Sequence, residues 1–484
     1  MKIEKYKPVF YPKSLLLVGA SSNPFKFGGL FLQAQLSFGF KGKIYPVNPK
    51  GGELFGIAAY KSIQEVTDPI DLAVITVPAA RTLQAVKDCV AIGVKSVQII
   101  TAGFREHSDE GRELEHQIAN LLEKAGIMLI GPNCFGVYSP QVGLTLIPGT
   151  EFPKDPGNVG FFSQSGGGAC DTVLQSYGRS VRFSVAVSFG NAAGIGPEEM
   201  LEYFAKDPAT EIVGAYIEGI EDGERFISAL KTCTREKPVV ILKAGLTEQG
   251  QRGTIGHTGS LAGSGEVWKS VIRSCGAIAA HDLRDLSDCL MALQCLKNFK
   301  GKAAGILTGG GARVVETLDA ADRFGFEVPE LDEHTREAIQ TVLPETGAGA
   351  GNPVDLANPF IFPEIINPAV SALADFGKID FLVLHQILFY SLSFNAAGSD
   401  SESDLSESLK DQHCMIAENA LRILKKTNKP LAIVLADIAS DPGHIAIEKG
   451  RLLARKYYTS KGIPCFDNTE RAFSVLNRIQ NRSN

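Results

Sequence analysis

Residues 14–29 read SLLLVGASSNPFKFGG, and this stretch decides the fold class. A short apolar run leads into a turn of glycine, serine, asparagine and proline, and glycines recur where the next element begins. An uninterrupted apolar run of this length is typical of a strand buried on both faces of a parallel sheet. A turn of this kind connects such a strand to a helix in nucleotide-type folds. The stretch therefore predicts the first strand, turn and helix of a doubly wound α/β domain.

The alternation of apolar runs and amphipathic stretches continues to about residue 140. Residues 80–92 and 109–125 are typical of crossover helices between parallel strands. The pattern predicts one doubly wound domain over residues 1–140. Its candidate strands are Ser14–Gly19, Lys43–Val47, Leu72–Val77, Ser96–Ile100 and Met128–Ile130.

Two further α/β series follow the first. The Pro/Gly-rich stretch 148–157 precedes a second domain over residues 150–299, and a third occupies residues 300–484. The predicted fold class is therefore α/β, with three consecutive doubly wound domains. Residues 391–411 are rich in Ser, Asp and Glu, and we expect a disordered surface insertion there. The candidate strands are Asn158–Phe162, Phe183–Val187, Glu211–Ile217 and Pro238–Lys243, then Ala303–Leu307, Phe381–His385 and Leu431–Leu435.

Composition excludes several classes of protein. The 484 residues are 44% hydrophobic and 21% charged, and the formal net charge of -6 gives no reason to expect a nucleic-acid partner. No apolar run approaches the roughly 20 residues needed to cross a bilayer, and the first residues lack the pattern of a secretory signal. The nine cysteines are scattered without zinc-like spacing. We therefore expect a cytoplasmic protein with buried thiols and no membrane segment.

The first turn departs from the dinucleotide-binding pattern in two ways. Residues 19–29 do not form G-x-G-x-x-G, and Val47-Asn48-Pro49-Lys50 stands where an acidic residue usually binds a ribose. A lysine attracts phosphate, so Lys50 and Lys26 favour a phosphate-bearing ligand such as coenzyme A over NAD. The alternative is a plain tight turn with two solvated lysines.

Three later loops also follow strands at the edge where open α/β sheets bind ligands. Ordinary turn chemistry is the alternative explanation for each of them. Cys134 in the last loop is a nucleophile by residue type, but no particular histidine is indicated as its base, so we expect a structural or gating role. The loops are Val77-Pro78-Ala79, Thr101-Ala102-Gly103-Phe104 and Gly131-Pro132-Asn133-Cys134.

A second candidate anion site follows the strand Asn158–Phe162. Residues 163–168 read SQSGGG and lead into a predicted helix. A hydroxyl and glycine amides at a helix N-terminus form an anion site. The alternative is an ordinary serine N-cap with glycines for close packing.

Residues 253–263 read GTIGHTGSLAG and place His257 among small residues. The segment is too rich in glycine for a helix or a central strand, so we expect a loop from which the imidazole reaches outward. Glu218 stands at the end of a predicted apolar strand. A carboxylate there can bind one imidazole N–H and leave the other nitrogen as a nucleophile. The alternative is an exposed loop histidine and a strand-end charge.

Taken together, these segments resemble the nucleoside-diphosphate-forming acyl-CoA synthetase family, kin of succinyl-CoA synthetase. The resemblance covers nearly the whole chain and is closest to the α subunit of ADP-forming acetyl-CoA synthetase. It implies a Rossmann-like CoA-binding domain followed by two flavodoxin-like ligase domains. The segments that carry it are GASSNPFKFGG, YPVNPK, ITAGFRE, GPNCFGV, GFFSQSGG, SFGNAA, YIEGIEDGERF, KPVVILKAG, HTGSLAGS, ILTGGGARVVETLDAADRFG and GNPVDL.

The resemblance implies a role for each matching residue. His257 is implied to be phosphorylated during turnover, and Glu218 to orient and stabilise the phosphohistidine. Asn133 belongs to the loop expected near the acyl thioester. The helix N-terminus implied to receive the phosphoryl group comprises Ser165, Gly166 and Gly167. The CoA-binding turns are matched by Gly19, Ser21, Lys26, Asn48, Pro49, Lys50, Val77 and Pro78.

The implied reaction converts acyl-CoA, phosphate and ADP into acid, CoA and ATP through an acyl phosphate and a phosphohistidine. Family members also need an ATP-grasp domain, for which the assigned residues leave no room and no P-loop substitutes. The resemblance therefore implies a separate ATP-grasp β subunit that binds Mg²⁺ and ADP or ATP, in a hetero-oligomer. It implies no metal site on this chain.

Two features depart from the family pattern. The Gly/Ala/Ser-rich run usual before the histidine is replaced by GLTEQGQRGTIG, with Arg252 and Ile255, and the insertion at 391–411 is not a hallmark of the family. Two other functions stay open. One is a non-catalytic or regulatory CoA-binding protein without an ATP-grasp partner. The other is an NAD-dependent dehydrogenase, which the missing acidic residue and Lys50 disfavour.

Overall fold

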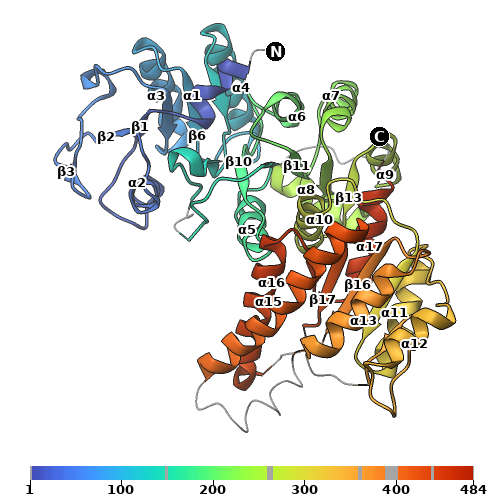
Figure 1. Cartoon of the computed structure of the whole chain (residues 1–484). Coiled ribbons are helices and arrows are strands. Elements are labelled where there is room, and N and C mark those ends of the chain that lie inside the picture. The colour runs from blue at the N-terminus through green and yellow to red at the C-terminus, as the bar shows by residue number, and fades with distance from the viewer. Residues whose placement is uncertain are drawn as a thin grey trace. The chain divides into compact units, whose positions relative to one another are not determined.

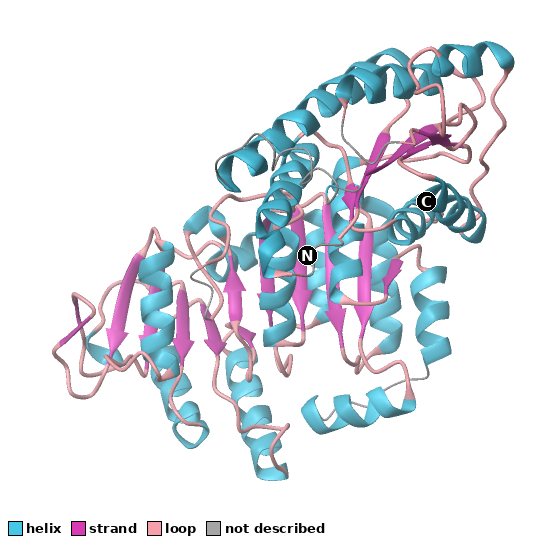
Figure 2. Cartoon of the chain, turned by 90° about the horizontal axis from the view of Figure 1, so that it is seen from below, coloured by secondary structure: helices cyan, strands magenta, loops and turns pink. Residues whose placement is uncertain are grey.

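The chain forms two compact units of α/β structure, which Figure 1 colours from blue to green and from yellow to red. In Figure 2 the strands of the sheets are magenta arrows with cyan helices packed against them. The units are Met1–Tyr177 with Val181–Leu286 and Arg482–Asn484, and Gly178–Ser180 with Ser287–Asn481. The computed structural model describes residues 3–147, 151–258, 265–357, 362–386, 388, 402–437 and 441–482.

The first unit begins with a five-stranded parallel sheet in the order β2-β1-β5-β6-β7. All five strands predicted for residues 1–140 are present. The strand order reverses between β1 and β5, so their carboxyl ends form the switch point at which open α/β sheets bind ligands. The strands are β1 Ser14–Val18, β2 Lys43–Val47, β5 Leu72–Ile75, β6 Ser96–Ile99 and β7 Met128–Ile130.

Alternate residues of β1 belong to two different hydrophobic clusters. Leu15 and Leu17 lie in one buried cluster, and Leu16 and Val18 lie in the other. Because successive side chains of a strand point to opposite faces, β1 is covered on both, which explains its unbroken apolar run. The other elements here are η1 Ile3–Tyr6, α1 Lys7–Phe10, α2 Phe27–Phe38, β3 Glu53–Leu54, β4 Ile57–Ala58, η2 Ile63–Glu65, α3 Ala79–Ala91 and α4 Asp109–Lys124.

The second sheet of this unit has the order β13-β12-β11-β9-β10-β8. Its edge strand β8 (Gly136–Tyr138) falls within the residues predicted for the first domain, yet it pairs antiparallel with β10. The division into 1–140, 150–299 and 300–484 stays a prediction. The other elements are η3 Pro140–Val142, β9 Val159–Ser163, α5 Gly166–Tyr177, β10 Phe183–Ser188, α6 Pro197–Lys206, β11 Ile212–Ile217, α7 Gly223–Glu236, β12 Val239–Lys243, α8 Glu248–Thr258, α9 Gly265–Ser274 and β13 Ile278–Ala280.

The second unit contains a parallel sheet in the order β15-β14-β16-β17-β18. Helices α15 and α16 pack side by side along it (Figure 1). No helix within the described ranges is long and apolar enough to span a membrane. The elements are α10 Leu283–Cys295, which the two units share, β14 Ala304–Thr308, α11 Gly311–Arg323, α12 Glu333–Gln340, β15 Val354–Asp355, α13 Pro363–Asp375, β16 Phe381–Gln386, α15 Glu402–Thr427, β17 Leu431–Leu435, η5 Pro442–His444, α16 Ile445–Ser460, β18 Cys465–Phe466 and α17 Thr469–Gln480.

A buried ion network holds the turn at 178–180 within the second unit. Arg179 pairs with Asp288 and, at 3.1 Å, with Asp467. Arg451 pairs with Asp467 at 2.8 Å, and Arg455 adds a further pair. Burial raises the pKa of the Asp467 carboxyl, but the three arginines outweigh it and hold that pKa at about 2.

The prediction of a loop around His257 was wrong for residues 253–258, which form the last turns of α8. The side chain of Thr247 accepts a hydrogen bond from the Gly250 amide at 3.1 Å and so caps the first turn of this helix. A cap of this kind contributes about 1 kcal/mol, which offsets part of the cost of about 1 kcal/mol for each interior glycine. Residues 259–263 lie outside the described residues.

The predicted insertion at 391–411 was also wrong in part. Residues 402–411 are the first turns of α15. Farther along this helix, Ile416, Ala420 and Ile423 are buried at helical spacing, so packing of the later turns supports a polar start. Residues 391–401 lie outside the described residues.

Candidate functional site

The glycines of the first turn let α2 pack directly against the end of β1. Gly19 has a φ of +94°, and a Cβ on Gly28 would overlap the carbonyl oxygen of Gly19. Glycine is therefore needed at both positions. No side chain caps α2, whose N-cap residue is Lys26. Side chains therefore do not compete with an anion for the amides of this helix N-terminus.

Residues 48–50 lie beside that turn. Asn48 Nδ2 donates to the Ala20 carbonyl at 2.8 Å, and Asn48 Oδ1 accepts from the Lys50 amide at 2.9 Å. Lys50 and Lys26 are both exposed. An uncapped helix N-terminus and two ammonium groups therefore lie at one edge, and these donors fit the pyrophosphate and 3′-phosphate of coenzyme A.

The end of β5 completes this edge. The Thr76 amide donates to the Val18 carbonyl at 2.9 Å, and a Cβ on Gly19 would stand 2.7 Å from Thr76 Oγ1. The turn and the loop after β5 therefore meet at the switch point. The residues predicted to bind CoA, all along the carboxyl ends of β1, β2 and β5, are Gly19, Ser21, Lys26, Asn48, Pro49, Lys50, Val77 and Pro78.

The predicted phosphate-binding turn caps α5. Ser165 Oγ accepts a hydrogen bond from the Gly168 amide at 3.1 Å. A Cβ on Gly166 would stand 2.8 Å from the ring of Phe135, whereas Gly167 faces open space. The helix N-terminus is therefore fixed by a serine cap and remains open to an anion at Gly167.

Gln164 joins this helix to the turn that carries Glu218. Its Nε2 donates to the Gly219 carbonyl at 3.0 Å, and its Oε1 accepts from the amides of Glu218 at 2.5 Å and Gly219 at 3.0 Å. Gln164 and Glu218 are 6% and 5% exposed. Because β9 and β11 are adjacent parallel strands, the predicted carboxylate and the predicted anion-binding helix lie side by side.

A buried lysine that sequence reasoning did not assign to the site adjoins Glu218. Lys243 ends β12, is 4% exposed, and donates from Nζ to the carbonyls of Glu218, at 2.8 Å, and Ala244. The ammonium lies 5.0 Å from the centre of the Trp268 ring. Burial lowers the pKa of Lys243 to about 8, although the Glu218 carboxylate acts in the opposite direction. The signal in the sequence was a lysine that closes an apolar strand, where a charge needs partners.

The loop that carries Asn133 contacts both of these regions. The Asn133 amide donates to the Thr101 carbonyl at 3.0 Å, and Thr101 Oγ1 donates to the Val77 carbonyl at 2.7 Å. Two residues later, Phe135 packs against Gly166. The predicted thioester loop therefore links the predicted CoA-binding edge to the predicted anion-binding helix α5.

Cys134 in the same loop is buried and lacks a thiolate near neutral pH. Its side chain is 1% exposed and its Sγ donates to the Ile99 carbonyl at 3.2 Å. Burial raises the pKa of the thiol to about 12. These features favour the predicted structural role over nucleophilic catalysis.

The position of the His257 imidazole stays a prediction, because its side chain lies outside the described residues. Its backbone is in the last turn of α8. This helix begins at Glu248, five residues after Lys243 in the chain. Among the described residues, no group of three or more His, Cys, Asp or Glu side chains could hold a metal ion.

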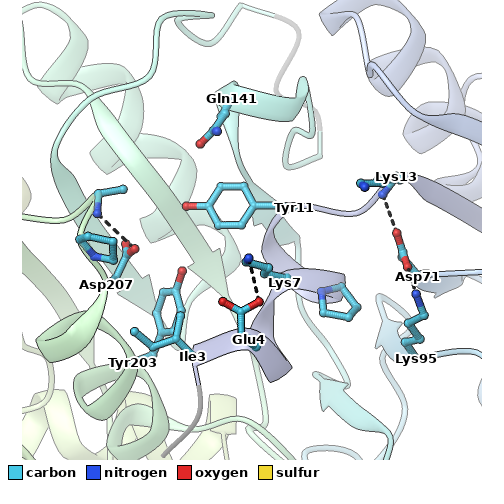
Figure 3. Close-up of a pocket in the computed structure, with 13 residues that line it drawn as sticks. Ile3, Glu4, Lys7, Tyr11, Lys13, Asp71, Lys95, Gln141, Tyr203 and Asp207 are labelled. Carbon is cyan, nitrogen blue, oxygen red and sulfur yellow. Dashed lines mark hydrogen bonds and ion pairs between the residues drawn. The ribbon is translucent and has the colours of Figure 1, made fainter.

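A pocket of about 760 Å³ in the first unit is separate from this site (Figure 3). Tyr11 lines it, together with the ion pairs Lys7–Glu4 and Lys95–Asp71, each at 2.7 Å. Asp71 and Lys95 precede β5 and β6, so the pocket lies at the amino ends of the strands. None of the predicted site residues lines it.

Two family descriptions match segments of the chain. Residues 13–140 match a CoA binding domain, and residues 156–293 match a succinyl-CoA ligase like flavodoxin domain. The first sheet therefore belongs to a Rossmann-like CoA-binding domain, and the second to a flavodoxin-like ligase domain.

Relatives and solved structures agree with these descriptions. The α subunit of ADP-forming acetate–CoA ligase II of Pyrococcus furiosus is 37% identical over 72% of this chain and 75% of its own length. ADP-forming acetate–CoA ligase I of Archaeoglobus fulgidus is 36% identical over 72% of this chain, which spans only 50% of that relative. Acetyl-coenzyme A synthetase 1 of Candidatus Korarchaeum cryptofilum, solved with phosphate and ADP, superposes with a TM-score of 0.79 at 28% identity, covering 99% of this chain and 96% of that one.

Proposed function

The chain belongs to the family of ADP-forming acetate–CoA ligases, and from this premise we propose that it is the α subunit of an ADP-forming acyl-CoA synthetase. It converts acyl-CoA, phosphate and ADP into acid, CoA and ATP. The reaction is reversible and passes through an acyl phosphate and a phosphohistidine at His257.

One observation carries the proposal: three predicted parts of the site are joined by contacts at one place. Gln164 ties the Ser165-capped helix to the Glu218 turn, and Phe135 of the thioester loop packs on Gly166. An acyl phosphate formed at the thioester loop would therefore arise next to an anion-binding helix N-terminus and a carboxylate. This is the arrangement that transfer of a phosphoryl group to an imidazole requires.

The edge formed by β1, β2 and β5 binds CoA. Lys26 and Lys50 pair with its phosphates, and the uncapped N-terminus of α2 receives the pyrophosphate. Asn133 lies near the thioester, where an amide N–H can polarise the carbonyl. Bound in this way, the acyl group is presented toward α5.

Each chemical step exchanges one bond for another. A phosphate oxygen attacks the thioester carbon, the C–S bond breaks, and CoA leaves as a thiol after it gains a proton. His257 then attacks the phosphorus atom, the bond to the acyl oxygen breaks, and the acid leaves. Glu218 holds the second imidazole N–H, and the amides at Gly166 and Gly167 stabilise the spread of negative charge. ADP finally takes the phosphoryl group.

The nucleotide half of the reaction is assigned to a partner. Relatives that carry the name α subunit share three quarters of their length with this chain, whereas a relative whose name carries no subunit designation is about twice as long as the matched part. We assign ADP or ATP and Mg²⁺ to an ATP-grasp β subunit in a hetero-oligomer. Mg²⁺ offsets phosphate charge in such sites.

Labelling of the purified chain with radioactive inorganic phosphate and a panel of acyl-CoAs tests the proposal. We expect label that is labile in acid and stable in base, absent in His257→Asn and weakened in Glu218→Gln. The matched control is His116→Asn, because His116 is an exposed histidine on α4 and its loss leaves the label intact. The acyl-CoA that labels most strongly identifies the acyl group.

A failure of labelling would support a different function for the chain. If no acyl-CoA gives label, even with an ATP-grasp partner added, the chain is a CoA-binding or regulatory protein instead. CoA still raises the melting temperature in that case, since a ligand of the folded state stabilises it. Stabilisation by NAD in place of CoA would overturn the assignment of the first sheet.

A further inference from the structure

Asn191 is a buried amide in the loop after β10, and its neighbours decide which way it faces. Its side chain is fully buried. Its Nδ2 donates to Glu106 Oε2 at 2.6 Å and to Glu115 Oε2 at 2.8 Å. Carboxylates only accept hydrogen bonds, so the nitrogen end of the amide must face them. The oxygen end therefore faces Asn133, whose Nδ2 lies 3.3 Å from Asn191 Oδ1.

The two carboxylates are themselves held in place. Glu106 Oε1 accepts from the amides of Gly103 at 2.6 Å and Phe104 at 3.1 Å. Burial raises the pKa of Glu106, but the hydrogen bonds from Asn191 and these amides outweigh it, and the pKa is lowered. Glu106 therefore stays an acceptor near neutral pH.

Arg105 closes the network from the other side. Its guanidinium donates to the backbone carbonyl of Asn191 and to Glu221 at 2.6 Å, and lies 3.5 Å from Glu115. Burial is the largest influence on Glu115 and raises its pKa. Two carboxylates therefore hold the side-chain amide of Asn191 and one arginine holds its backbone, an arrangement that costs solvation energy and so favours a positional role.

The backbone of Asn133 is fixed separately. It has a φ of +56°, and its backbone amide donates to the Thr101 carbonyl. The backbone amide of Asn191 donates to the Pro132 carbonyl at 3.0 Å. The hydrogen bond to Asn191 then uses one of the two hydrogens on Asn133 Nδ2. The second hydrogen remains for the carbonyl oxygen of a thioester.

We propose that Asn191, held by Arg105, Glu106 and Glu115, is a positioning residue that aims the Asn133 amide at the thioester of acyl-CoA. The inference rests on the proposed function, because it assigns Asn191 to the first chemical step. It also distinguishes the steps: Asn191 serves attack on the thioester and has no part in phosphoryl transfer from an acyl phosphate to His257.

A double-mutant cycle with two substrates tests this. Label from acetyl-CoA with radioactive phosphate reports both steps, whereas label from radioactive acetyl phosphate reports the second alone. We expect Asn133→Ala and Asn191→Ala each to slow labelling from acetyl-CoA by about 10- to 100-fold, and the double variant to be no slower than the worse single variant. Labelling from acetyl phosphate changes less than about threefold in each.

Gln35→Ala is the matched control. Gln35 is a fully buried amide that also bridges distant segments, donating to the Thr145 carbonyl at 2.8 Å and accepting from its amide at 3.0 Å. Its loss lowers the melting temperature without selective loss of labelling from acetyl-CoA. If Asn191→Ala does not fold, Glu106→Gln takes its place, because the variant keeps the side-chain volume and weakens the hold on the Asn191 amide.

The outcomes separate the two proposals. Additive effects of the Asn133 and Asn191 variants, or equal losses with both substrates, overturn the positioning role while the wild type still labels. No label on the wild type from any acyl-CoA or from acetyl phosphate overturns the proposed function itself. A selective, non-additive loss with acetyl-CoA supports both.

Discussion

Replacing Lys243 by methionine is expected to slow phosphoryl transfer to His257 while costing less than about 3 kcal/mol of unfolding free energy. The loss of stability is limited because the charge of Lys243 is itself unfavourable in the folded chain. Its pKa is lowered from 10.5 to about 8, which corresponds to about 3 kcal/mol for carrying the charge in the fold at pH 7. Methionine removes that cost. It also removes hydrogen bonds to the Glu218 and Ala244 carbonyls, worth about 1.5–3 kcal/mol each, so the net loss lies between zero and about 3 kcal/mol.

The pH dependence of stability has a definite sign. Because the pKa of Lys243 is lower in the folded chain than in the unfolded chain, the cost of its charge is fully present below pH 8. It disappears as the pH rises toward the unfolded value of 10.5. The wild type should therefore gain stability relative to Lys243→Met between pH 8 and pH 10.5. Over the same range the wild type loses the ammonium beside Glu218, so labelling of His257 should fall.

Urea unfolding at pH 7 and pH 10, together with labelling from acetyl phosphate, checks both effects. Lys237→Met is the matched control, since Lys237 also donates to two backbone carbonyls, of Phe204 at 2.5 Å and Asp207 at 2.6 Å, and burial lowers its pKa. It is expected to alter stability and leave labelling unchanged. The reasoning is refuted if Lys243→Met is labelled as fast as the wild type, or if Lys237→Met loses as much labelling as Lys243→Met.

Three further predictions concern other parts of the chain. Gly28→Ala should weaken CoA binding at least tenfold in calorimetric titration, because its Cβ overlaps the Gly19 carbonyl; Gly223→Ala, with no heavy atom within 4 Å, is the control, and equal affinities would contradict the packing. Arg179→Met should lower the free energy of unfolding in urea by about 3–5 kcal/mol, since it leaves buried carboxylates short of a partner; a loss below about 1 kcal/mol would contradict this. The pKa of His413 is lowered to about 3 by burial, so stability should fall as pH drops below 6.5, by about 3 kcal/mol at pH 4. In urea unfolding, His413→Gln should lose less stability than the wild type between pH 6.5 and pH 4. An equal loss in the variant would assign the loss of stability in acid to other groups.

The sequence predicted the most buried strands of the first unit well, because a strand buried on both faces must be largely apolar. β1 and β12 are examples, and both begin and end within two residues of prediction. Edge strand β8 was missed. It has only three residues, Gly136–Tyr138, which pair with β10, and so short a segment has no pattern that predicts an antiparallel edge strand.

Helices were harder to predict where tertiary packing overrides composition. Glycine content predicted a loop over residues 253–258, yet a cap from Thr247 begins a helix that continues through them. Polar composition predicted disorder over residues 391–411, yet 402–411 continue into a packed helix. In both cases the deciding contact lies outside the segment whose composition was considered.

The sequence predicted the glycines and helix caps of the candidate site, but not the buried side-chain amides that hold its loops in place. Gln164 and Asn191 both lie inside segments that carry the family resemblance, GFFSQSGG and SFGNAA, but the local sequence does not show that either amide is buried. Each amide is buried, and groups that only donate or only accept fix its orientation: backbone groups at both ends of Gln164, and carboxylates at the nitrogen end of Asn191. Gln164 fixes the Glu218 turn and Asn191 fixes Asn133. Because a buried amide with both ends satisfied has one allowed orientation, the same device would fix both the thioester step and the phosphoryl step, and a substitution at either amide should impair one step without the other.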